Sequence, residues 1–248
     1  MALQRVKTEA ETALEEHFAA RTDAGEPEWL AARRRQAFER LAAAGLPNRR
    51  VEAWHFTDLR RHMSAAYAPA EREAAEAVPV IAVDEPFGAA EAARVVLVNG
   101  YLRPDLTDLD RLPDGVTLQS FGEAARGKDE ALEATLGSAL SDDGGAIATL
   151  NGAFASDGVV IRIAEEAQIK TPLHLMFVND AGEPVSSHAR NLITVGAGAR
   201  ASLIECHLGR GDYQGSAVTE MLIGEGAEID HVKLQDQSLE AIHLDLMA

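Results

Sequence analysis

The sequence predicts an α+β chain: a helical N-terminal region followed by a partial right-handed parallel β-helix. The main observation is a recurring motif, Val-Gly-Ala-Gly-Ala-Arg-Ala at 195–201 and Ile-Gly-Glu-Gly-Ala-Glu-Ile at 223–229, with a looser copy at 163–169. Each copy places a small turn between runs of alternating apolar residues, which is typical of short strands. Similar turns at recurring spacing indicate stacked coils, each too small to bury its apolar face alone.

Size and composition agree with a folded chain. The 248 residues suffice for one large domain or two small ones, and a hydrophobic fraction of 46% is ample for a core. No stretch reaches the roughly 18 apolar residues that a membrane span requires, and the N-terminus does not resemble a signal peptide. The single cysteine, Cys206, excludes an internal disulfide. We therefore expect a reducing, cytoplasmic setting.

The net charge of −17 argues against binding nucleic acid, which requires clustered Lys and Arg. The one basic run, Arg33-Arg34-Arg35, lies in a helical pattern, and we expect it to be a solvated helix face. The acidic balance favours solubility and could steer a basic protein partner to the surface.

We divide the chain near residue 145 into a mainly helical region, 1–145, and the first coils of a β-helix, 146–248. In the first region, apolar spacing predicts an amphipathic helix over 3–20 and a second helix from Pro27 to Gly45. Residues 64–78 are rich in Ala and Glu with little apolar pattern, which indicates a mobile linker.

A β-rich run at 94–98 ends in Asn99-Gly100, which predicts a small hairpin with Tyr101-Leu102. Weak helices are expected at 120–126 and 128–140, before a break at 141–145.

The second region begins with a short helix at 146–154, and strands follow it. We expect them at 159–163, 173–178, 191–195, 202–207, 219–223, 229–235 and 242–246. Solenoids usually have a polar cap at each end, and the sequence shows none. The chain therefore looks like a fragment whose exposed strand edges could cause self-association.

Several segments resemble the SufB/SufD family. The resemblance rests on ordered motifs at 46–59 (Leu-Pro-Asn-Arg-Arg-Val-Glu-Ala-Trp-His-Phe-Thr-Asp-Leu), 98–101, 112–116, 150–158 (Leu-Asn-Gly-Ala-Phe-Ala-Ser-Asp-Gly), 190–193 and 203–205. The N-terminal helices and the spacing are more similar to SufD than to SufB.

This resemblance implies a non-catalytic scaffold subunit of the SufBCD complex, which assembles iron–sulfur clusters. It also implies pairing with SufB through the β-helices and docking of the SufC ATPase on C-terminal helices beyond this chain. The family's cluster-related residues lie mainly in later coils. We therefore assign no catalytic, cofactor-binding or metal-binding residue here, and expect no cofactor in this chain.

Two local groups could suggest a metal site. Cys206 and His207 follow Glu205, but adjacent strand residues point to opposite faces, so we expect Cys206 to be structural. Five histidines lie in the β-helix, and stacked coils could align two of them as metal ligands. Because spacing alone does not establish this, we expect scattered surface histidines: His174, His188, His207, His231 and His243.

Three further features have ordinary structural interpretations. Trp54 could be a partner contact, but we expect it to anchor a connector to the core. The run 186–188 (Ser-Ser-His) lacks a nucleophile elbow and is expected to be a loop between coils. The glycines at 196 and 198 lack the third glycine and following helix of a dinucleotide fingerprint.

Two enzyme classes fit the sequence less well. A β-helix polysaccharide lyase or hydrolase is usually secreted and needs paired carboxylates, which the missing signal peptide and 5% aromatic content disfavour. A hexapeptide acyltransferase does not fit the spacing of the turns. The remaining alternative is a standalone β-helix protein-interaction module without a role in cluster assembly.

Overall fold

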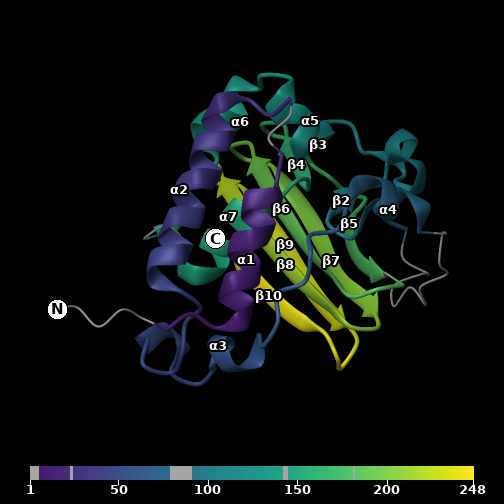
Figure 1. The fold of residues 1–248 in the computed structure, drawn as a ribbon. Helices are drawn as coiled ribbons and strands as arrows, with labels where there is room; N and C mark the ends of the chain where they lie inside the picture. Colours follow the sequence, from purple (N-terminus) through teal and green to yellow (C-terminus); the bar gives the residue numbers. More distant parts are fainter. Residues whose placement is uncertain (1–5, 23–24, 79–90, 142–144, 181) are drawn as a thin grey trace.

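Two five-stranded β-sheets face each other, and helices cover the outer face of one of them (Figure 1). This computed structural model describes residues 6–22, 25–78, 91–141, 145–180 and 182–248. The architecture is α+β, with a helical N-terminal region and about three turns of a parallel β-solenoid, as the sequence predicts.

The chain alternates between the two sheets as it winds. One sheet has the order β2-β1-β5-β7-β9 and the other β10-β8-β6-β4-β3. The strands are β1 (Ala93–Val98), β2 (Tyr101–Leu102), β3 (Val116–Ser120), β4 (Val159–Ile163), β5 (Leu173–Asp180), β6 (Val185–Val195), β7 (Arg200–Arg210), β8 (Tyr213–Ile223), β9 (Glu228–Asp236) and β10 (Ile242–Met247).

The repeated motif sets the register of the last coils. Arg200 on β7 pairs in parallel with Glu228 on β9, 28 positions later, and Val185 on β6 pairs with Tyr213 on β8. Every expected strand is present, and most extend beyond the predicted limits. The segment 186–188, which we expected to be a loop, lies inside β6 because its backbone pairs with β8.

Glycine is required where the turns stack. A Cβ on Gly196 would lie 2.4 Å from the backbone N of Glu165, and a Cβ on Gly224 would lie 2.6 Å from the N of Ala197. The amide of Gly196 donates to the carbonyl of Ile163, so each turn rests on the turn before it. The glycines of the motif therefore allow close approach of backbones, and the strand β7 that follows excludes a dinucleotide fingerprint, as expected.

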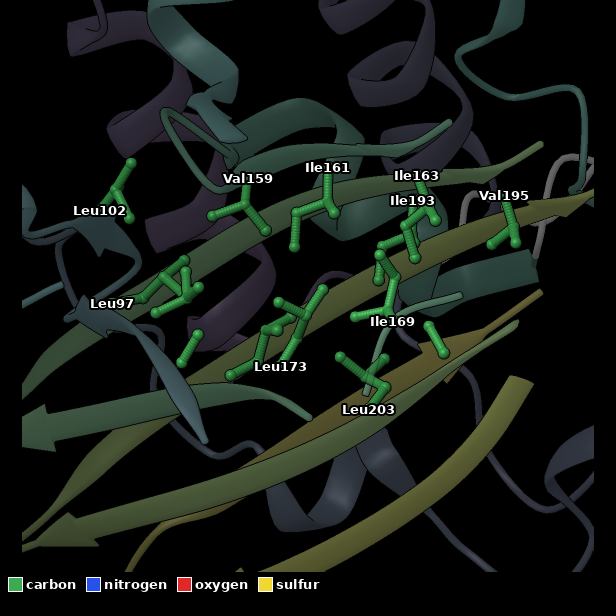
Figure 2. Close-up of a cluster of buried hydrophobic side chains, with 14 of the residues drawn as sticks. Leu97, Leu102, Val159, Ile161, Ile163, Ile169, Leu173, Ile193, Val195 and Leu203 are labelled. Atoms are coloured by element: carbon green, nitrogen blue, oxygen red, sulfur yellow. The ribbon is translucent and has the colours of Figure 1, made fainter. Parts of the chain in front are cut away.

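Aliphatic side chains from both sheets fill the interior of the β-helix (Figure 2). Leu97, Ile161 and Ile193 are almost completely buried there, and each such side chain contributes roughly 1.5–3 kcal/mol through burial. Successive side chains along a strand point to opposite faces. The second apolar set therefore lies on the outer faces, under other elements.

The first coil is closed by antiparallel strands. β2 pairs with β1, and β3 pairs with β4, at the two edges where the sheets begin. The expectation that neither end is capped is therefore wrong at this end. Strands from before residue 145 belong to both sheets. β1 pairs in parallel with β5 in one sheet, and β3 pairs with β4 in the other.

The helices agree with the sequence patterns in place but not always in length. The first begins after Thr8, whose side chain forms a capping box with Glu11. The predicted start at residue 3 lies outside the described residues, and the helix that the structure describes begins at Glu9. The segment predicted at 128–140 forms only α6. The helices are α1 (Glu9–Ala20), α2 (Glu28–Ala44), α3 (Leu59–His62), α4 (Arg72–Ala77), α5 (Phe121–Arg126), α6 (Glu130–Thr135) and α7 (Gly145–Phe154).

Helices α1, α2 and α7 pack together beside the sheet that contains β10, β8 and β6 (Figure 1). The Phe18 and Phe38 rings stack with centroids 4.0 Å apart, and Phe154 meets both edge-on. Ile242 and Leu244 of β10 pack against the same cluster. The helical layer and the last coil therefore share one apolar contact. Among the described helices, none has the length and apolarity to cross a bilayer.

Residues 64–78 are packed against the β-helix, so the expectation of a mobile linker is wrong. Ala66, Ala70 and Ala75 are buried, and the amide of Ala70 donates to the carbonyl of Ser186 on β6. Small side chains give little apolar pattern, but they allow this close approach to the sheet.

Candidate functional site

Charged and imidazole side chains meet inside the last coils of the β-helix. Alternation along β7 points Glu205 and His207 to the same face as buried Leu203. On β9, Lys233 pairs with Glu205, and β10 lies in the facing sheet. We call this group the interior polar cluster: Glu205, His207, His231, Lys233, His243 and Asp245.

Glu205 is the central anion of the cluster and is 1% exposed. Its Oε1 lies 2.5 Å from His207 Nε2 and 2.9 Å from Lys233 Nζ, and its Oε2 lies 2.9 Å from His231 Nε2. Burial raises the pKa of this carboxyl, but the hydrogen bonds and charges of His207 and Lys233 outweigh burial and hold the pKa at about 2. Glu205 is therefore a carboxylate at neutral pH.

β10 brings a second carboxylate and another imidazole to the same place. The His243 ring meets the His207 ring at 4.7 Å and 67°, and Asp245 Oδ1 lies 3.9 Å from His207 Nε2. Burial, reinforced by the charges of His207 and Lys233, lowers the pKa of His243 to about 4. His207, His243 and Asp245 each offer a ligand atom, and these atoms lie within 4.8 Å of one another.

The expectation of scattered surface histidines is wrong. His174, His188 and His207 are 1%, 8% and 2% exposed, and three of the five β-helix histidines belong to the interior polar cluster. Sequence spacing missed this because β9 and β10 belong to the coil after β7, and β10 lies in the facing sheet. Strand alternation could have indicated this, because Glu205 and His207 take inward-facing positions on β7 where apolar residues are expected.

Cys206 lies on the opposite face of β7 from His207, as expected from strand alternation. The thiol is completely buried among apolar side chains, and its Sγ lies 3.1 Å from His174 Nε2. Cys206 therefore packs in the outer apolar cluster, on the face of β7 away from His207.

The segment 150–158 connects α7 to the β-helix. Asn151 Nδ2 donates to the carbonyl of Ala189 at 2.9 Å. Asp157 is completely buried and accepts from the Ser120 hydroxyl at 2.6 Å and from Arg72 at 2.8 Å. These contacts give the polar residues of the segment a structural role that the sequence did not reveal.

Two other predictions concern the helical region. The basic run is only partly a solvated face: Arg34 is 2% exposed and pairs with Glu26, with Nε 2.8 Å from Oε1, whereas Arg35 is solvated. Trp54 packs against the helical core cluster, as expected of an anchor.

Residues 8–175 match the family model described as "SufBD protein N-terminal region". Residues 177–248 match "SUF system FeS cluster assembly, SufBD core domain". The chain belongs to the SufB/SufD family. The description of the second model ties this family to iron–sulfur cluster assembly.

Two curated relatives agree with this assignment. The chain is 28% identical over 228 residues to the iron-sulfur cluster assembly SufBD family protein slr0076 of Synechocystis, covering 87% of this chain and 49% of the relative. It is 23% identical over 215 residues to "Protein ABCI7, chloroplastic" of Arabidopsis thaliana, covering 83% of this chain and 44% of that protein. The chain thus spans about half the length of the curated relatives it matches.

Proposed function

We propose that this SufB/SufD-family chain is a non-catalytic scaffold subunit of a SufBCD complex and that it acts as the SufD-type member. The observation that carries the proposal is the match of the SufBD core domain to residues 177–248, which form the stacked coils from β5 onward. The presence of the N-terminal helices α1 and α2 supports the SufD type, since these helices and the spacing of the motifs are more similar to SufD than to SufB.

The β-helix suits a scaffold because parallel ladders and a packed interior make a rigid body. β9 and β10 are the end strands of the two sheets, so one edge of each has no strand partner within the described residues. We propose that SufB pairs with the β-helix. SufC would join through C-terminal helices outside these 248 residues.

The proposal includes a cytoplasmic setting and no iron–sulfur cluster resident in this chain. The cluster is the cargo of the whole complex. A reducing compartment is compatible with the single cysteine, whose thiol is buried and reduced.

The experiment is a co-purification of SufB and SufC with the tagged 248-residue chain, beside the same chain extended by the C-terminal coils and helices of a family relative. We expect the extended chain to retain both partners. The control is the unextended 248-residue chain, which we expect not to retain SufC.

If the extended chain retains neither SufB nor SufC, the scaffold proposal is wrong. A standalone β-helix interaction module then becomes the better interpretation. Retention of both SufB and SufC by the extended chain supports the scaffold proposal.

A further inference from the structure

The interior polar cluster contains a metal-ligand set that β7 and β10 complete together. His207 comes from one sheet, and His243 and Asp245 come from the other; their ligand atoms lie within 4.8 Å of one another. We propose that His207, His243 and Asp245 bind one divalent transition-metal ion inside the β-helix. This departs from the expectation, made from the sequence, that the chain has no metal ligand.

The ligand types suit such an ion. Imidazole nitrogen and carboxylate oxygen bind Zn²⁺ and Fe²⁺, at bond lengths near ~2.0–2.2 Å for Zn²⁺. Two ligands of a tetrahedral ion with such bonds lie roughly 3.3 Å apart. His207 Nε2 and Asp245 Oδ1 are 3.9 Å apart, so a small side-chain rotation brings them to a common ion.

Glu205 adjoins this ligand set and would become a fourth ligand after a small shift of its carboxylate. Its Oε1 is 2.5 Å from His207 Nε2, the nitrogen that also faces Asp245. On binding, the ion replaces the proton shared by this nitrogen and Glu205, and that proton moves to Nδ1 or to solvent. The ring of His231, 2.9 Å from Oε2, orients the carboxylate from the other side.

The surroundings leave little room for water. A cavity of about 20 Å³ adjoins His207 and His243, enough for about one water molecule. The Phe177 ring stacks on His207 with centroids 4.6 Å apart and covers one side. An ion here would bind protein ligands and at most one water, which favours a transition metal over Mg²⁺.

Lys233 supplies the positive charge in the metal-free cluster. Its Nζ lies 2.9 Å from Glu205 Oε1 and 2.5 Å from Asp245 Oδ2. A metal ion between the same carboxylates must displace this ammonium group. The Lys233 side chain is 28% exposed, so the ammonium group can swing toward water. Lys233 therefore competes with the metal, and its removal should strengthen metal binding.

The first measurement is a Co²⁺ titration of the metal-stripped, tag-free 248-residue chain, followed by visible absorption and by competition with Zn²⁺. We expect saturation at one ion per chain and an intense absorption band typical of four-coordinate Co²⁺. Zn²⁺ should also raise the Tm, because it binds only the folded chain.

Variants assign the ligands. His243→Ala and Asp245→Asn should each weaken Co²⁺ binding at least ~10-fold, and Glu205→Gln by about 10- to 100-fold. Lys233→Met should bind Co²⁺ more tightly than the wild type and should have a lower Tm in chelator. The matched control is His62→Ala, since His62 is exposed and outside the cluster.

Absence of saturable Co²⁺ binding to the wild-type chain would overturn the proposal. Equal binding by His243→Ala, Asp245→Asn and the wild type would also overturn it. If Lys233→Met unfolds in chelator, refolding with Zn²⁺ distinguishes the two roles of this position. Recovery of the fold with Zn²⁺ supports the metal site. Failure to refold would mean that the Lys233 ammonium group, and not a metal ion, neutralises the carboxylates of the cluster.

Discussion

Arg190 on β6 and Glu220 on β8 form an ion pair between neighbouring coils of the β-helix, with Nη2 2.5 Å from Oε1 and side chains 6% and 0% exposed. Glu220 on β8 also accepts hydrogen bonds from the amides of Gly137 and Ala139. One carboxylate thus joins two neighbouring coils to the segment after α6. Figure 1 shows the helical layer packed beside β6 and β8.

Neutralising this carboxylate should destabilise the fold strongly. Glu220→Gln leaves the buried Arg190 without its charge partner, and such a loss typically costs about 3–5 kcal/mol. Urea unfolding measures the change in the free energy of unfolding. The control is Glu228→Gln in the exposed pair with Arg200, for which we expect less than about 1 kcal/mol. Similar values for the two variants would contradict the buried pair.

Gly158 should not tolerate a side chain. Its φ is +147°, and a Cβ there would lie 1.9 Å from the carbonyl oxygen of Arg190. We expect Gly158→Ala to cost more than about 4 kcal/mol or to abolish soluble expression. Gly182→Ala, where a Cβ has open space, is the control. A thermal melt of Gly158→Ala close to that of the wild type would refute the approach of these two strands.

His188 should make the fold sensitive to acid. Burial, reinforced by the charges of Arg21 and Arg34, lowers the pKa of His188 from 6.5 to about 3. Between these values the unfolded chain binds a proton that the folded chain does not. Stability is therefore lost as the pH falls below 6.5, by about 1.4 kcal/mol per pH unit.

Urea midpoints at pH 7, 5 and 4 test this for the wild type and His188→Gln. Because other groups titrate in the same range, the difference in slope between the two chains is the quantity to compare. His62→Gln, at an exposed position, should keep the wild-type slope. Parallel curves for His188→Gln and the wild type would show that burial does not shift this histidine.

The thiol of Cys206 should be protected in the folded chain, since it is completely buried. We expect Ellman's reagent to react with it at least ~100-fold more slowly than in urea, the factor given by an opening free energy of about 2.8 kcal/mol. The comparison is a His62→Cys thiol in a Cys206→Ala background, which should react at once. Rapid labelling of native Cys206 would mean that β7 is open at this face.

The strands could be predicted because their signals are local. Alternating apolar residues and glycine-bearing turns mark the expected strands without reference to the rest of the chain, whereas β3 was not expected. The helix α2 was predicted on similar grounds, since Pro27 and Gly45 bracket it. The packed segment 64–78 could not be, because small side chains give no periodic signal and Ala70 bonds to a strand far along the chain.

The sequence by itself determined the α+β class, the stacked coils, the structural place of Cys206 and the family, because each depends on short-range patterns or ordered motifs. Only the tertiary structure decided that Glu205, His207, His243 and Asp245 share one interior, and that Arg190 pairs with Glu220. The physical reason is the winding of the β-helix. Parallel register brings residues of successive coils side by side, and closure of each coil sets the two sheets face to face. Neither relation can be inferred from the spacing of residues along a single strand.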